Sequence, residues 1–140
     1  VYDFDNSPAV RKLAGRIAAE RGLHIYSVFK IPYAERCFSL CGPENFLGLV
    51  QGADFVLSNS FHATAFSVIF EREFAVVERT EKINTRMRDF TTMLGLSDHM
   101  VTTETEIPAG TDWTAVRRCL KDEIDHAKAY IDEVLRDVER

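Results

Sequence analysis

The stretch Ser58–His62 places several groups that can bind or protonate a substrate within five consecutive residues. Two serine hydroxyls, the Asn59 amide and the His62 imidazole lie where an apolar, strand-like run ends and an apolar helical pattern begins. The first turn of a helix has backbone N–H groups without partners, and the helix dipole favours negative charge there. We therefore predict that this turn binds a phosphate or a carboxylate, with His62 as ligand or acid/base. The alternative is a helix cap at Asn59 or Ser60, followed by a core histidine bonded to a backbone carbonyl.

Three arginines, Arg79, Arg86 and Arg88, follow the next strand-like run. A cation at a helix start is electrostatically unfavourable unless an anion lies nearby. We expect these arginines to reach the same edge of the sheet as the Ser58–His62 turn. The alternative is that they are solvated and pair with Glu81 or Asp89.

Two other motifs could do chemistry but are less complete. Asp3 and Asp5 form a D-x-D motif at a predicted strand end, as in phosphatases that use an aspartyl nucleophile and Mg²⁺, but the next residues enter a helix directly. Cys37 and Cys41 have a spacing that zinc sites use, but no second Cys/His pair at ligand spacing completes four ligands. We predict no metal site and no cofactor, and free thiols for the odd number of cysteines.

Short apolar runs alternate with helical patterns along the chain, and this alternation predicts the elements that position these residues. Predicted strands lie near 1–4, 23–29, 54–58, 73–78 and 99–102, and predicted helices near 8–21, 42–53, 60–70, 85–94 and 113–140. Residues 30–41 have no clear pattern. The order predicts an α/β fold, a Rossmann-like doubly wound, mainly parallel sheet with helices on both faces, in one domain over 1–140. Ligands of such sheets bind at the carboxyl ends of the strands, where the Ser58–His62 turn falls.

The last predicted helix has one continuous apolar stripe. Its members recur at spacings of three and four: Trp113, Val116, Leu120, Ile124, Ala127, Ile131, Val134 and Val138. At 1.5 Å per residue the helix over 113–140 would be about 42 Å long, so its far end should extend beyond the domain. We expect this end to self-associate, giving a homo-oligomer, or to fray. The alternative is a bend after Leu120 that folds the helix onto its own sheet.

Composition excludes some classes of function. The net charge is −5 and no Lys/Arg cluster alternates with aromatic residues, so a nucleic-acid partner is not predicted. The longest apolar stretches are far shorter than the roughly 18 residues of a membrane span, and the start lacks the pattern of a signal peptide. We expect a cytoplasmic protein. Because VYDFD already has the pattern of a strand in progress, we also expect the chain to be part of something larger.

Five short motifs follow one another along the chain between residues 42 and 96. They are G-P-E-N-F-L-G-L at 42–49, S-N-S-F-H-A-T at 58–64, V-I-F-E-R-E-F at 68–74 and N-T-R-M at 84–87, followed by L-G-L at 94–96. This order resembles the polysaccharide pyruvyl transferase family, strongly over 42–96 and weakly on the flanks. Ala63 stands where glycine is common in the family, and Arg72 and Glu73 replace a frequent Lys-Pro pair, which we expect to affect only a loop.

The resemblance implies a two-domain architecture like that of GT-B glycosyltransferases, in which this chain matches the C-terminal, donor-side domain. A separate N-terminal domain would supply the acceptor site, so the chain alone would be incomplete for catalysis. The family transfers the enolpyruvyl group of phosphoenolpyruvate to two sugar hydroxyls in surface polysaccharide synthesis, giving a pyruvate ketal and phosphate. The chain's partners would therefore be phosphoenolpyruvate and a saccharide acceptor.

His62 matches the motif histidine of the family, and the resemblance implies that it is the catalytic acid/base. The residues expected to bind substrate are Ser58, Asn59, Ser60, Arg79 and Arg86. One alternative is half of a nucleotide-sugar glycosyltransferase, although no acidic residue is clearly placed for a ribose. A second alternative is a non-catalytic ligand-binding module.

Overall fold

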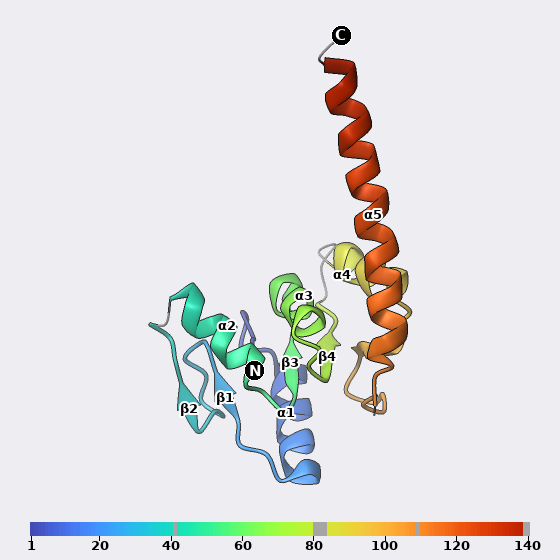
Figure 1. Cartoon of the computed structure of the whole chain (residues 1–140). Helices are drawn as coiled ribbons and strands as arrows, with labels where there is room; N and C mark the ends of the chain where they lie inside the picture. The colour runs from blue at the N-terminus through green and yellow to red at the C-terminus, as the bar shows by residue number, and fades with distance from the viewer. Residues whose placement is uncertain (41, 80–83, 109, 139–140) are drawn as a thin grey trace.

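The computed structural model describes residues 1–40, 42–79, 84–108 and 110–138. Figure 1 shows the arrangement of its elements. In chain order they are α1 (Pro8–Arg21), β1 (Tyr26–Ser27), β2 (Arg36–Cys37), α2 (Pro43–Gln51), β3 (Val56–Ser58), α3 (Phe61–Ile69), β4 (Phe74–Val77), α4 (Asn84–Met93), the 3-10 helix η1 (Ser97–His99), β5 (Met100–Val101) and α5 (Trp113–Val138).

All strand pairs in the described ranges are parallel, as the alternation of strands and helices predicts. β3, β4 and β5 form one sheet in that order, and β1 pairs with β2. The segment at the start of the chain connects the two: the Val1 nitrogen donates to the Tyr26 carbonyl (2.6 Å), and Tyr2 forms a parallel bridge with Ser58. Val1 and Tyr2 therefore lie between β1 and β3.

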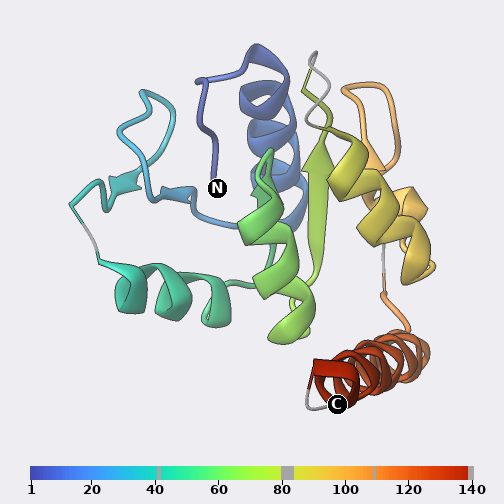
Figure 2. The ribbon, with the colours of Figure 1, turned by 90° about the horizontal axis from the view of Figure 1, so that it is seen from above.

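Helices cover both faces of the sheet, because the strand side chains alternate between two hydrophobic cores. Phe74 and Val76 of β4 belong to a core shared with α2, α3, α4 and α5. Ala75 and Val77 of the same strand pack against α1. In Figure 2, α1 lies on the opposite side of the strands from α2 and α3. This arrangement confirms the predicted α/β, Rossmann-like fold.

The strands are shorter than the sequence pattern predicts. The run at 23–29 contributes only Tyr26 and Ser27 to β1, and the run at 1–4 contributes a single bridge at Tyr2. β2 has no counterpart among the strands predicted from the sequence, because Arg36 and Cys37 are both exposed and carry no apolar alternation. Cys41 lies outside the described residues.

Turn chemistry sets one end of α1 and one end of α5. α1 ends at Gly22, whose φ of 65° is the left-handed conformation that glycine adopts most readily. α5 begins after Asp112, whose carboxylate accepts the N–H groups of Thr114 and Ala115, both at 3.1 Å.

Glu73 does more than shape a loop, contrary to our expectation for this position. Its carboxylate accepts the N–H of Thr111 at 3.2 Å and the Thr111 hydroxyl at 3.1 Å. Thr111 also lies 3.1 Å from Nε2 of the buried His99. Glu73 therefore ties the start of β4 to the segment that leads into α5.

Only the first turns of α5 pack against the rest of the molecule. The helix has 26 residues, which corresponds to about 39 Å. Val116 is buried, whereas every residue from 121 to 136 is exposed. Figure 1 shows the helix projecting far beyond the sheet. The structure thus has a continuous, extended helix rather than the alternative with a bend after Leu120; the side chain of Val138 lies outside the described part.

Candidate functional site

The turn after β3 is buried and bonded to itself. Ser58, Asn59 and Ser60 are each less than 5% exposed. The Ser60 N–H donates to the Ser58 hydroxyl oxygen at 2.8 Å. The Ser60 carbonyl accepts both the N–H (3.1 Å) and the hydroxyl (2.9 Å) of Thr64. These bonds hold the backbone as it passes from strand to helix.

Asn59 joins this turn to the beginning of the chain. Its side-chain NH₂ donates to the Asp3 carboxylate at 2.8 Å, and its side-chain oxygen accepts the Phe4 N–H at 3.2 Å. Asp3 is 1% exposed and also accepts the Ser7 N–H and the Tyr33 hydroxyl. Burial and the Asp3 carboxylate together raise the pKa of Tyr33 well above its usual value. The D-x-D motif suggested a nucleophile at Asp3, whereas in the structure Asp3 is a buried anchor for two loops.

His62 lies in the first turn of α3 and is exposed to solvent. It is therefore not the buried core histidine of the alternative interpretation. The preceding Ser60 occupies the N-cap position, but its side chain makes no capping hydrogen bond. Among the described residues, the N–H groups of Phe61, His62 and Ala63 have no hydrogen-bond partner. Donors of this kind at a helix start favour an anion.

The ring of Phe61 brings the starts of α3 and α4 together. The Arg86 guanidinium lies over this ring, 5.3 Å from its centroid. The imidazole of His62 packs edge-on to the same ring at 6.3 Å, and Phe90 of α4 packs on it at 5.5 Å. His62 and Arg86 thus contact the same aromatic side chain, Phe61, which was not among the site residues predicted from the sequence. The sequence feature that could have identified Phe61 as a site residue is its position directly before the motif histidine, His62.

The other two arginines have carboxylate partners. Arg79 follows β4 and pairs with Asp5 at 2.6 Å, with its guanidinium 5.9 Å from the Phe4 ring centroid. Arg88 pairs with Glu78 at 2.8 Å. Arg86 is exposed, and no carboxylate of the described ranges lies within ion-pair distance of it. The structure therefore places Arg79 at the same sheet edge but ties it to the loop after Phe4 through Asp5. Arg86 lies over the Phe61 ring. Glu81 lies outside the described residues.

Two further features bear on the class of site. In the described part of the chain, no three His, Cys, Asp or Glu side chains are grouped so that they could hold a metal ion. The helices in these same ranges are all too short or too polar to cross a membrane.

Comparison with known proteins identifies the family. A family model described as polysaccharide pyruvyl transferase matches residues 1–81, more than half of the 140 residues. The match includes the Ser58–His62 turn and Arg79 and ends before Arg86. No curated protein and no solved structure matches the chain. The chain therefore belongs to the polysaccharide pyruvyl transferase family.

Proposed function

We propose that this chain is the donor-side part of an enzyme that transfers pyruvate from phosphoenolpyruvate to a sugar as a ketal, in the cytoplasm, during cell-surface polysaccharide synthesis. A second domain would supply the acceptor site. The observation that carries the proposal is the arrangement at the α3 start: an exposed His62, three N–H groups without partners in the described chain, and Arg86 against the shared Phe61 ring.

The proposed reaction needs one acid/base and a site for two anionic groups. Protonation of the methylene carbon of phosphoenolpyruvate produces a methyl group and a cationic centre at the adjacent carbon. A sugar hydroxyl attacks this centre and releases its proton. The C–O bond to phosphate then breaks, phosphate leaves, and a second hydroxyl attacks the cationic centre that this regenerates and releases its proton, which closes the ketal. His62 supplies the proton or accepts one, because an imidazole can do both near neutral pH.

The phosphate or carboxylate of the donor would bind at the α3 start. In this proposal the N–H groups of Phe61–Ala63 and the Ser60 hydroxyl donate hydrogen bonds to the anion, and Arg86 supplies positive charge. The side chains of Ser58 and Asn59 are engaged in bonds within the chain, so their role is to position the turn. Arg79 would contribute by fixing the neighbouring loop through Asp5.

A titration of this chain with phosphate or phosphoenolpyruvate tests the binding step. Amide chemical shifts should change at residues 59–63 and at Arg86 because these groups surround the proposed anion. Arg86→Gln should weaken binding several-fold, whereas Arg118→Gln, at another exposed arginine on α5, should not. Chemical-shift changes confined to other surfaces would show that the anion does not bind at the α3 start.

Thermal melts distinguish between phosphoenolpyruvate and a nucleotide sugar as the donor. A rise in melting temperature with phosphoenolpyruvate and none with nucleotide sugars supports the pyruvyl transferase proposal, because a ligand that binds the folded state stabilises it. The reverse pattern would favour the glycosyltransferase alternative. Absence of transferase activity in the intact enzyme, despite binding, would favour the non-catalytic module.

A further inference from the structure

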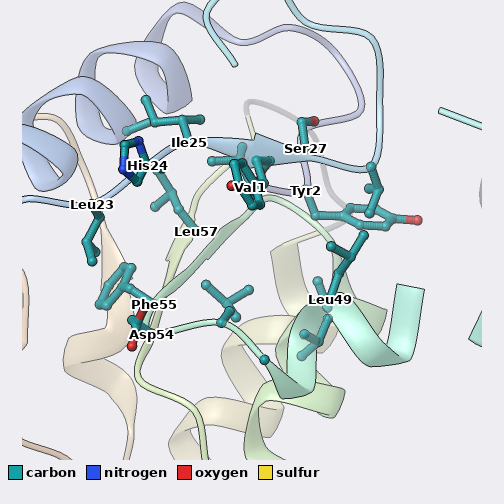
Figure 3. A pocket seen from close by; sticks show the side chains of 18 of the residues that line it. Val1, Tyr2, Leu23, His24, Ile25, Ser27, Leu49, Asp54, Phe55 and Leu57 are labelled. Atoms are coloured by element: carbon teal, nitrogen blue, oxygen red, sulfur yellow. Dashed lines mark hydrogen bonds between the residues drawn. The ribbon is translucent and has the colours of Figure 1, made fainter. Parts of the chain in front are cut away.

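Phe61, the first residue of α3, links the proposed anion site to α4. A cavity of about 490 Å³ lies on another side of α3, between α1, β1, α2 and β3 (Figure 3). Ala63 of α3 lines this cavity, whereas Phe61 does not. The ring of Phe61 packs instead with side chains of α4, against the hydrophobic core that the two helices share. Phe61 therefore belongs to the α4 side of the helix start.

Phe90 of α4 supports the Phe61 ring. The two ring centroids are 5.5 Å apart and the rings are inclined at 68°, an edge-to-face geometry that stabilises aromatic pairs. Both side chains are half-buried. Phe90 lies four residues after Arg86, and residues four apart lie on the same side of a helix. One side of α4 therefore presents both Phe90 and Arg86 to the ring.

The face of the Phe61 ring attracts the Arg86 guanidinium, which lies 5.3 Å from the ring centroid. The face of an aromatic ring is electrostatically negative and attracts a cation, although the ring has no net charge. A carboxylate, by contrast, neutralises an arginine and accepts its N–H groups, as Glu78 does for Arg88 at 2.8 Å. A ring partner thus holds a guanidinium in place and leaves its charge and its donors for an anion.

The same ring contacts His62, the proposed acid/base. The imidazole packs on the Phe61 ring with a centroid distance of 6.3 Å and an angle of 76° between the ring planes. Phe61 and His62 are consecutive residues in the first turn of α3, whereas Arg86 comes from the first turn of α4. The Phe61 ring therefore sets where the Arg86 cation lies relative to His62.

We propose that Phe61 is a positioning residue for the donor: its ring holds the Arg86 guanidinium at the α3 start, beside the N–H groups of residues 61–63. This inference rests on the function proposed above, in which these groups bind the phosphate or carboxylate of the donor. Phe61 acts through Arg86. Loss of the ring should therefore weaken anion binding only while Arg86 is present.

A double-mutant cycle tests this role, with inorganic phosphate as the probe and amide chemical shifts at residues 59–63 as the readout. Phe61→Leu removes the ring but keeps an apolar side chain, and it should weaken phosphate binding about threefold, the effect expected of an exposed cation–π contact. Phe61→Tyr keeps the ring face and should bind phosphate like the unmodified chain. Adding Phe61→Leu to Arg86→Gln should weaken binding no further than Arg86→Gln alone.

Phe66→Leu is the matched control on the same helix. Phe66 is also half-buried, and it packs on Phe46 and Phe70 rather than on α4 side chains. Phe66→Leu should lower the melting temperature and leave phosphate affinity unchanged. Equal weakening of phosphate binding by Phe66→Leu and Phe61→Leu would overturn the proposal, because general loosening of α3 would explain both. An effect of Phe61→Leu that persists undiminished beside Arg86→Gln would overturn it as well.

Failure of this role and failure of the proposed function give different results. If the unmodified chain binds neither phosphate nor phosphoenolpyruvate at the α3 start, the anion site is wrong, and the role of Phe61 fails with it. If phosphate binding is normal in Phe61→Leu but weakened in Arg86→Gln, the site stands and only the role of Phe61 is overturned. Phe61→Met, which also lacks a ring, decides between these results if Phe61→Leu does not fold.

Discussion

At the scale of single residues, His62 combines exposure with a position at a helix start. His62→Ala in the intact enzyme should lower kcat by about 10²-fold or more, the usual effect of removing an acid/base, with little change in folding. Phosphate release from phosphoenolpyruvate in the presence of acceptor measures the rate, and circular dichroism measures the fold. His126→Ala, at an exposed histidine of α5, is the control and should retain activity. Near-normal turnover of His62→Ala would reject the assignment.

Asp3, unlike the exposed His62, is buried, and we expect it to contribute to stability. Its buried carboxylate accepts hydrogen bonds from Asn59, Ser7 and Tyr33. Asp3→Asn should lower the free energy of unfolding by about 1–3 kcal/mol, because an amide cannot accept all of these bonds and leaves buried groups without partners. Denaturant unfolding measures the loss.

The neighbouring Asp5 provides the matched control for Asp3. Its side chain is 51% exposed and pairs with Arg79. Exposed ion pairs contribute little to stability, so Asp5→Asn should cost less than about 1 kcal/mol. Equal losses for the two variants would show that Asp3 is not the anchor of the turn.

At the scale of elements, the start of α5 depends on one cap. Asp112 accepts two N–H groups that the helix cannot satisfy itself. Asp112→Ala should cost about 0.5–2 kcal/mol of stability and should speed amide exchange in the first turn. Asp122→Ala, on the exposed surface of the same helix, should change stability by no more than about 0.5 kcal/mol. Equal losses of stability in Asp112→Ala and Asp122→Ala would show that the Asp112 cap does not stabilise α5.

At the scale of the whole molecule, the outer part of α5 exposes an apolar stripe. Ile131 is 53% exposed, Val134 is 42% exposed and Leu135 is 56% exposed. Exposed apolar patches of this kind favour association. We predict that the chain self-associates through this stripe and that Ile131→Glu/Val134→Glu is monomeric with nearly unchanged stability. Sedimentation velocity measures the association.

A second double variant separates the stripe from the polar side of α5. Asp132→Ser/Glu133→Ser changes exposed neighbours of the stripe and should still associate. The prediction would be wrong if the unmodified chain is monomeric and the Glu variant loses stability like a core mutant, since the stripe would then pack within its own molecule.

The sequence by itself determined the order and type of most elements and the edge at which the candidate site lies. β3, α3, β4 and α5 follow from apolar periodicity, and the Asp112 cap and the Gly22 end follow from turn chemistry, all of which are local properties of the chain. The position of His62 after a parallel strand follows from the same local pattern, because βαβ order already sets which strand ends share an edge.

Only the tertiary structure decided which side chains meet there. Asn59 reaches Asp3 across 56 positions, Arg79 pairs with Asp5, and Arg86 lies over the Phe61 ring. The exposed β2 was likewise invisible in the sequence pattern. The physical reason is that periodicity reports which side of an element is apolar, whereas contacts between distant residues depend on how strands pair and how helices pack on them.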